Sequence, residues 1–333
     1  MSQTATVRWG ILGTARIAAR VAAAIHAAEG AELVLVGSRD AERAAAWAAE
    51  HDVPRSCGSY AEVLDDPDID AVYIPLPPSM HREWTLRAAE LGRHVLCEKP
   101  LAVSSSEAEE MAVGCREHGV QLMDGVMWLH HPRATDMRRI LDSDSLGELR
   151  RVTSAFTFSW DPFPQDDLRL HRELGGGALL DLGWYCVGAT LWAFEEMPVR
   201  VWGTARWRND VDLNFSGQMW FEGQRAASFD CGFDTVIRKW MEVAGTRGTL
   251  ACSDFTRPQN ADRPAFRINA ADGTYRKEIS LPPVQEVCMI EAFCKQIRTE
   301  ELNEHWPRRA VQTQRVCEAL DQSARLGEPV ELG

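Results

Sequence analysis

Residues 7–18 are Val7-Arg8-Trp9-Gly10-Ile11-Leu12-Gly13-Thr14-Ala15-Arg16-Ile17-Ala18. The apolar run that ends at Leu12 predicts a short buried strand, and the alanine-rich stretch over 17–28 predicts a helix. A glycine-containing turn joins the two. This stretch therefore predicts the first strand, turn and helix of an α/β domain.

The alternation of strand and helix continues along the first 125 residues. Further strands are expected over 33–36, 71–74 and 94–97, and further helices over 41–51, 81–91 and 107–118. Ser104 and Glu107 have the spacing of a capping box, which places the start of the last helix. Such alternation forms right-handed βαβ units, so residues 1–125 are predicted to hold a doubly wound parallel sheet.

The pattern changes after Asp124. Segments 149–158, 199–207, 218–221 and 226–233 have strand character, and the later ones follow one another without intervening helices. This predicts an antiparallel sheet in a second domain of the α+β class, over residues 126–333.

Composition limits the partners and the location. The chain has 333 residues, enough for two domains, and a net charge of −13, which argues against broad binding to nucleic acid or acidic membranes. Its nine cysteines are scattered without a CxxC pair, which predicts reduced thiols and neither a disulfide framework nor a metal site. No leader and no membrane-spanning run is recognised, so a cytoplasmic location is expected.

The glycine turn has the spacing of a dinucleotide-binding motif. Gly10 and Gly13 take two of its positions, and Ala15 stands where the usual motif has the glycine that approaches a pyrophosphate. The helix that follows offers free N–H groups to a phosphate. A purely structural turn is the alternative, but the position at the head of a βαβ series favours a cofactor. The predicted cofactor contacts also include Thr14, Arg16 and Ile17.

The second predicted strand ends in Gly37-Ser38-Arg39, where the adenosine ribose of such a cofactor lies. No acidic residue stands at the strand tip to accept hydrogen bonds from both ribose hydroxyls. Ser38, Arg39 and Arg43 can instead bind a 2′-phosphate, which favours NADP over NAD. The alternative is an ordinary solvated cluster of Arg39 and Arg43 with Asp40 and Glu42.

Two further loops are predicted to face the nicotinamide. Pro75-Leu76-Pro77 follows the strand over 71–74 as a stiff wall, and His81 is expected to position this loop rather than act as a base. Glu98-Lys99-Pro100 follows the strand over 94–97. Because ligands bind beyond the carboxyl ends of parallel strands, the Lys99 ammonium is expected to face the site.

A second cluster lies in the predicted α+β domain. The segment Gly175-Gly176-Gly177-Ala178-Leu179-Leu180-Asp181 allows the backbone to approach a ligand, and Asp181 and Tyr185 share one face if the segment is α-helical. Tyr185 can exchange a proton with a substrate oxygen, and a nearby lysine cation favours its ionised form. The alternative is a buried tyrosine that is hydrogen-bonded to Asp181.

Together these segments resemble the glucose-fructose oxidoreductase, inositol dehydrogenase and MocA (Gfo/Idh/MocA) family over essentially the whole chain. The matching segments are 9–15, 73–77, 97–100 and 175–185. The resemblance implies an N-terminal Rossmann domain, a C-terminal domain with a large open antiparallel sheet, and NAD(P)-dependent oxidation or reduction of a sugar or cyclitol. It also implies a homodimer or homotetramer that forms through the sheet.

The resemblance also assigns roles to single residues. Lys99 matches the family's catalytic lysine, Asp181 its site aspartate, and Tyr185 a position held by histidine or tyrosine. Members with tyrosine there include dihydrodiol dehydrogenases, and Leu168-Arg169-Leu170 is similar to the xylose dehydrogenase branch.

One departure from the family concerns sugar binding. Many members have an arginine where this chain has Leu129. Arg169 or Trp160 is expected to supply the missing contact, and Trp128 is a further candidate for stacking on a sugar face. The proline-containing acidic stretch 161–167 is expected to form a loop at the mouth of the site.

The expected reaction moves a hydride between a sugar carbon and nicotinamide C4. Tyr185 takes the hydroxyl proton, Lys99 stabilises the developing alkoxide, and Asp181 orients the substrate or holds the lysine charge. Three alternatives stay open: a reductase of a keto sugar, a dihydrodiol or cyclitol dehydrogenase, and a non-catalytic NADP-binding regulator.

Overall fold

The predicted strand, turn and helix at the start of the chain are present. β1 (Val7–Leu12) is buried along most of its length, and α1 (Arg16–Ala27) buries small and branched apolar side chains on one face. Between them Gly13 has φ +107°, a left-handed conformation that favours glycine. The computed structural model describes residues 6–160, 167–270, 273–278 and 284–332.

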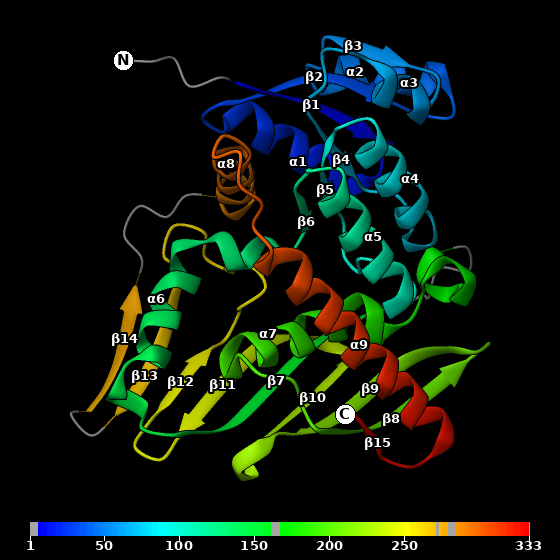
Figure 1. Cartoon of the computed structure of the whole chain (residues 1–333). Coiled ribbons are helices and arrows are strands. Elements are labelled where there is room, and N and C mark those ends of the chain that lie inside the picture. Colours follow the sequence, from blue (N-terminus) through cyan, green and yellow to red (C-terminus); the bar gives the residue numbers. More distant parts are fainter. Residues whose placement is uncertain (1–5, 161–166, 271–272, 279–283, 333) are drawn as a thin grey trace. The chain divides into compact units, whose positions relative to one another are not determined.

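β1 belongs to a six-stranded sheet (Figure 1). From edge to edge the order is β3 (Arg55–Cys57), β2 (Ala31–Gly37), β1, β4 (Ala71–Ile74), β5 (His94–Cys97) and β6 (Leu122–Asp124). All neighbouring pairs are parallel. The connecting helices are α2 (Ala41–Glu50), α3 (Tyr60–Asp65), α4 (Pro78–Glu90) and α5 (Ser105–Glu117). The predicted doubly wound parallel sheet is confirmed.

The sheet brings the predicted cofactor residues to one edge. The strand order reverses between β1 and β4, and ligands of such sheets bind at the carboxyl ends of the strands beside this reversal. Gly13, Ser38, Pro75 and Glu98 are the residues that directly follow β1, β2, β4 and β5.

Two strands of this sheet and one of its connecting helices were not predicted. β3 and β6 have three residues each, and α3 has six. Such short elements contain too few residues for a strand or helix periodicity to be recognised.

The chain forms two compact units, and their limits differ from the predicted division after residue 125. The first unit contains 1–130 and 283–311, and the second contains 131–282 and 312–333. Long-range packing explains the difference: α8 (Gln285–Ile297) buries Met289, Ile290 and Phe293 in the core that contains Trp9. The ring centroids of Trp9 and Phe293 are 5.3 Å apart. α9 (His305–Leu326) begins in the first unit and ends in the second.

The second unit is built on a nine-stranded sheet (Figure 1). Its order is β14 (Gly273–Glu278), β13 (Ala265–Ala270), β12 (Thr249–Cys252), β11 (Asp234–Gly245), β7 (Leu149–Ser159), β10 (Ala226–Gly232), β9 (Val211–Trp220), β8 (Arg200–Arg208) and β15 (Val330–Glu331). The pair β7 and β10 is parallel, so the sheet is mixed rather than purely antiparallel. The other pairs are antiparallel as predicted.

Two helices of the second unit lie before and after β7 in the sequence. α6 (Pro132–Asp142) precedes β7, and α7 (Trp184–Phe194) lies between β7 and β8. The segment 172–194 is long and apolar enough to cross a membrane. However, 72% of its most apolar stretch of 18 residues is buried inside the protein. A helix that is apolar on all sides is expected in a core. Of the predicted loop 161–167, residues 161–166 lie outside the described residues.

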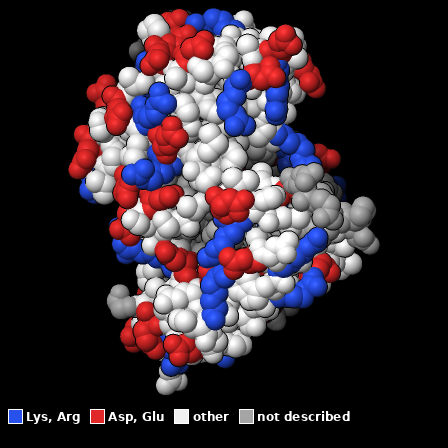
Figure 2. Space-filling model, turned by 90° about the vertical axis from the view of Figure 1, so that its right-hand side faces the viewer, with Lys and Arg blue, Asp and Glu red and all other residues white. Residues whose placement is uncertain are grey.

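Charged side chains of both signs are mixed on one face of the protein. Figure 2 shows lysine and arginine side chains interspersed with aspartate and glutamate over the face that it draws. The net charge of −13 is therefore not gathered into one acidic area on the described part of this face.

Candidate active site

The turn after β1, where a dinucleotide pyrophosphate is expected, is closely packed. A Cβ on Gly13 would lie 3.0 Å from Leu76 Cδ2, and one on Gly10 would lie 2.5 Å from Val63 Cγ1, so both positions need glycine. No side chain caps α1 at Ala15, and its first turn has no acidic residue. The Ala18 N–H donates to the Ala15 carbonyl oxygen at 2.9 Å, and the other N–H groups at the start of α1 can bind a ligand phosphate. The predicted residues Thr14, Ala15 and Ile17 are partly exposed there, and Arg16 is exposed.

Two arginines near the end of β2 are the predicted contacts of a 2′-phosphate. Ser38 is buried, and its Oγ accepts a hydrogen bond from the Asp40 N–H at 3.3 Å. Asp40 caps α2 by accepting from the Arg43 N–H at 3.0 Å. Arg39 and Arg43 are exposed, and neither forms an ion pair within the described residues. The Asp40 carboxylate is thus the N-terminal cap of α2.

His81 joins the loops that follow β4 and β5. Its ring is fully buried; Nε2 lies 2.8 Å from the Leu76 carbonyl oxygen, and Nδ1 lies 3.0 Å from that of Pro100. Burial lowers the pKa of His81, although the surrounding carbonyl groups oppose this shift. A buried ring between two carbonyl groups suits the positioning role better than that of a base.

Glu98 supports the backbone at Lys99. Its carboxylate is buried; Oε1 accepts from the Tyr73 hydroxyl at 2.7 Å, and Oε2 accepts from the Lys99 N–H at 3.2 Å. Burial raises the pKa of Glu98, and the Tyr73 hydrogen bond opposes this. A Cβ on Gly125 would lie 2.8 Å from Oε1, so glycine is required there. The peptide between Lys99 and Pro100 is cis, and the Lys99 side chain is partly buried.

In the second unit, Arg169 contacts two of the other predicted substrate residues, Asp181 and Trp160. Its Nε lies 2.6 Å from Asp181 Oδ2, and its guanidinium carbon lies 5.4 Å from the ring centroid of Trp160. Its Nη1 also donates to Asp167 at 3.2 Å. Burial alone would lower the pKa of Arg169, but the carboxylates of Asp181 and Asp167 raise it. Asp167 was predicted only as part of the loop 161–167 and not as a partner of Arg169, although its place two residues before Arg169 was a usable signal.

The backbone around Asp181 differs from the prediction. Leu179–Gly183 is a π-helical turn, so the α-helical spacing expected for Asp181 and Tyr185 does not apply. π-Helical turns occur often at functional sites. The Tyr185 ring is partly exposed and packs edge-on against Phe156, with centroids 5.4 Å apart.

The glycine run makes room for the protein's own atoms. A Cβ on Gly176 would lie 2.6 Å from the Arg169 carbonyl oxygen, and one on Gly177 would lie 2.1 Å from Asp212 Oδ1. These glycines thus meet a packing requirement of the protein itself, and the approach of their backbone to a ligand or cofactor stays a prediction. Asp212, on β9, contacts this glycine run, and the local sequence does not reveal that contact.

Trp128 is almost entirely enclosed in the first unit. Its side chain is 2% exposed in a short 3-10 helix, Met127–His130, and so offers little surface to a sugar. Trp160 is only partly buried and remains the better candidate for stacking. Within the described residues, no group of three His, Cys, Asp or Glu side chains is arranged to hold a metal ion.

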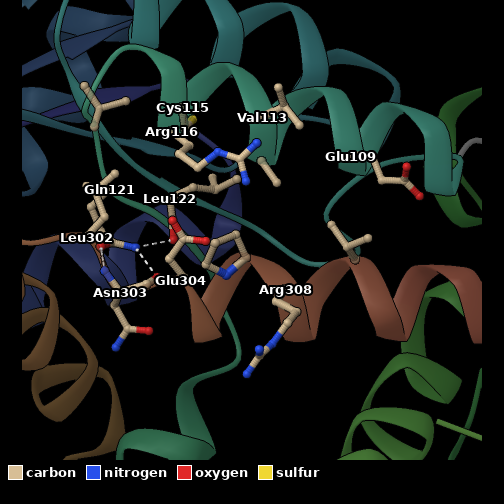
Figure 3. Close-up of a pocket in the computed structure, with 14 residues that line it drawn as sticks. Glu109, Val113, Cys115, Arg116, Gln121, Leu122, Leu302, Asn303, Glu304 and Arg308 are labelled. Carbon is tan, nitrogen blue, oxygen red and sulfur yellow. Dashed lines mark hydrogen bonds between the residues drawn. The ribbon is translucent and has the colours of Figure 1, made fainter.

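A hollow of about 260 Å³ lies away from these loops in the first unit (Figure 3). α5, β6 and the start of α9 line it. Gln121, which lines it, donates to the Asn303 carbonyl oxygen at 3.1 Å and accepts from the Asn303 N–H at 2.7 Å. None of the predicted site residues lines this hollow.

Asp212 is expected to make stability depend on pH. Burial raises its pKa from 3.8 to about 8, against the backbone hydrogen bonds that it accepts. Because the folded state holds this proton more tightly, the stabilising contribution is complete below pH 3.8 and is lost as pH rises through about 8. Asp212→Asn has no such proton. The variant's Tm relative to wild type is therefore expected to increase by about 4 °C or more between pH 4 and 8.

Thermal unfolding of both proteins across this pH range measures the effect. Glu328→Gln removes an exposed carboxyl group of the same unit and is the control. Its Tm relative to wild type should not change between pH 4 and 8. Parallel Tm curves for wild type and Asp212→Asn would contradict the assignment of a raised pKa to Asp212.

The chain matches two family models. Residues 7–126 match an oxidoreductase family with an NAD-binding Rossmann fold, and residues 135–251 match the GFO/IDH/MocA C-terminal domain. D-xylose 1-dehydrogenase (NADP(+)) 2 of Haloferax volcanii is 35% identical, over 97% of this chain and 99% of the relative. The dTDP-3,4-didehydro-2,6-dideoxy-alpha-D-glucose 3-reductase of Saccharopolyspora spinosa is 37% identical, over 88% of each.

Solved structures agree with these matches. A 3-ketoreductase from Actinomadura kijaniata in complex with NADP and TDP-benzene superposes with a TM-score of 0.88 at 29% identity, over 96% of this chain and 98% of that one. An aldose-aldose oxidoreductase from Caulobacter crescentus has a TM-score of 0.90 at 26% identity, over 98% and 100%. The chain therefore belongs to the GFO/IDH/MocA family and is an NAD(P)-dependent oxidoreductase that acts on hydroxyl or carbonyl groups of sugars.

Proposed function

We propose that this enzyme uses NADP+ to oxidise an uncharged aldose, such as xylose or a related pyranose. The Arg169 cluster is the observation that supports this choice. One guanidinium lies between Asp167 and Asp181, so the group as a whole has one negative charge, and Trp160 lies beside it. Carboxylates accept hydrogen bonds from sugar hydroxyls, and an aromatic face packs on sugar C–H groups.

The division of labour follows from side-chain chemistry. When bound, the nicotinamide accepts or donates the hydride. Lys99 is proposed to stabilise the alkoxide that develops on the sugar oxygen, because a fixed ammonium is most effective where negative charge forms. Tyr185 is proposed to take the hydroxyl proton. Solved structures of the Actinomadura kijaniata 3-ketoreductase include a variant with one tyrosine replaced and a variant with one lysine replaced. The proposed roles fall on the same two residue types.

Asp181 is proposed to orient the sugar. Arg169 donates to its Oδ2, which fixes the carboxylate, and a carboxylate accepts hydrogen bonds from sugar hydroxyls. The same Arg169 guanidinium is held by Asp167 and packed on Trp160, so the group is preorganised before substrate binds.

We further propose that NADP is preferred to NAD. Arg39, after β2, and Arg43, in the first turn of α2, are exposed, and the Asp40 carboxylate caps α2. Arg39→Asp is expected to raise KM for NADP+ by about 10- to 100-fold, because a hydrogen bond to a charged group contributes about 1.5–3 kcal/mol. The KM for NAD+ should rise much less.

Initial-rate kinetics with both cofactors measure this change. Arg116→Asp, at an exposed arginine of α5, is the matched control and should leave both KM values unchanged. An equal effect of Arg39→Asp on NADP+ and NAD+ would contradict a 2′-phosphate contact.

Reduction of a keto sugar is the second candidate. The similarity to dTDP-sugar 3-reductases favours it, and the same residues can serve the reverse reaction. The negative charge of the Arg169 cluster disfavours a pyrophosphate-linked sugar at that point, because like charges repel. A dihydrodiol or cyclitol dehydrogenase would use the same residues, and a non-catalytic regulator would need neither Lys99 nor Tyr185.

We propose that the protein forms a homo-oligomer through the large sheet. Along β8 buried and exposed side chains alternate, and Trp202 on the open face is 38% exposed. Val236 and Ile237 at the start of β11 are 73% and 63% exposed. Light scattering should give the mass of a dimer or tetramer, and Trp202→Glu should weaken the association. A monomer at micromolar concentration would contradict the proposal.

A cytoplasmic location is also proposed. All nine cysteines are free thiols, and all except Cys57 are buried. Proteins with many unpaired cysteines are typical of reducing compartments.

A further inference from the structure

Asp212 on β9 lies directly against the start of the helix that contains two of the proposed site residues. Its Oδ2 accepts a hydrogen bond from the Leu179 N–H at 2.7 Å, and its side chain is buried. Its Oδ1 occupies the space where a Cβ of Gly177 would stand, at 2.1 Å. Gly177 has φ +118°, which favours glycine for a second reason.

This carboxyl group supplies what the helix start lacks. The first N–H groups of a helix have no partner within the helix and need an acceptor from elsewhere. Neither Ala178, before the π-helical turn, nor Gly183, before α7, provides a side-chain cap. Asp212 therefore acts as a cap that a neighbouring strand supplies.

A second strand holds the same turn. Cys231 on β10 donates its thiol to the Ala178 carbonyl oxygen at 3.4 Å. A Cβ on Gly183 would lie 3.1 Å from Cys231 Sγ, so the end of the turn also approaches β10 closely. The turn from Gly177 to Gly183 is thus fixed to the sheet from both β9 and β10.

We propose that Asp212 is a positioning residue for the sugar reaction. By holding the N–H of Leu179, it fixes the π-helical turn that contains Asp181 and precedes Tyr185, and so sets where these two side chains stand. The inference rests on the proposed roles of Asp181 and Tyr185. Asp212 itself is placed under the backbone and is assigned no contact with substrate.

Two substitutions at this position separate positioning from packing. Asp212→Ala removes the acceptor, and kcat is expected to fall about 10- to 100-fold, because a displacement of about 1 Å at a reacting group costs about that much. The KM for the sugar should rise, while the dissociation constant of NADP(H) should stay unchanged. Asp212→Asn keeps an oxygen acceptor and is expected to restore kcat to within about threefold of wild type, because Asn and Asp cap equally well.

Ser59→Ala is the matched control for loss of a helix cap. Ser59 caps α3 by accepting from the Glu62 N–H at 3.2 Å, and α3 contains none of the proposed site residues. This variant should lose stability without a change in kcat. Equal kcat values for wild type and Asp212→Ala would overturn the proposal.

A second variant serves if Asp212→Ala does not fold. Gly177→Ala keeps the carboxyl group but places a Cβ against it, and kcat is expected to fall while NADP(H) binding persists. An unchanged kcat in this variant would also overturn the proposal. If Tyr185→Phe keeps full activity, the proposed function itself fails. If kcat falls in Tyr185→Phe but not in Asp212→Ala, only the positioning role of Asp212 is refuted.

Discussion

Lys99→Met is expected to lower kcat by about a hundred- to a thousandfold, the loss that follows removal of one group that stabilises an oxyanion. Methionine keeps the length of the side chain but has no charge. The loop should keep its shape, because Glu98 holds the Lys99 N–H through its carboxylate and His81 contacts the Pro100 carbonyl oxygen. Cofactor binding and Tm should therefore remain near those of wild type.

Steady-state kinetics with sugar and NADP+, together with NADPH binding by fluorescence, measure this loss. Lys295→Met, at an exposed lysine in the last turn of α8, is the matched control and should have normal turnover. Near-normal turnover of Lys99→Met with bound cofactor would remove Lys99 from the mechanism.

Tyr185→Phe is the second variant with a large expected effect. Loss of a group that exchanges a proton with the substrate lowers kcat by about 10²- to 10⁴-fold. The phenylalanine ring keeps the edge-on packing against Phe156, so the fold should persist. Tyr275→Phe, at an exposed tyrosine of β14, is the matched control and should leave kcat unchanged.

The pH profile separates the two roles. If Tyr185 takes the proton, log kcat of wild type has a limb that Tyr185→Phe loses and Lys99→Met keeps. The opposite pattern would assign the proton to Lys99 and leave Tyr185 as a hydrogen-bond donor. Full activity of Tyr185→Phe would contradict both assignments.

The sequence predicted the first sheet well because its signals are local. β1, β4 and β5 have the predicted limits, and Ser104 caps α5 by accepting from the Glu107 N–H as the capping box indicates. The membership of α8 in the first unit depends on contacts between Phe293 and Trp9, which are far apart in the chain. No local pattern reports such a contact.

The site shows the same division between local and long-range information. Arg169, Asp181 and Trp160 were predicted as site residues, and the structure brings them together. The packing role of the glycine run was missed, because the space next to Gly177 is filled by Asp212 from β9. A strand that arrives 33 residues later leaves no signal near residue 179.

Reduction of NADP+ in the presence of free aldoses tests the account most directly. Purified enzyme is mixed with NADP+ or NAD+ and with D-xylose, other aldoses, inositols or diols, and the absorbance of the reduced cofactor is followed; a parallel series offers NADPH with nucleotide-activated keto sugars. The account predicts NADP+-dependent oxidation of an uncharged aldose, and loss of that activity in Lys99→Met and Tyr185→Phe. Turnover of nucleotide-activated keto sugars alone, with no aldose oxidised, would contradict it.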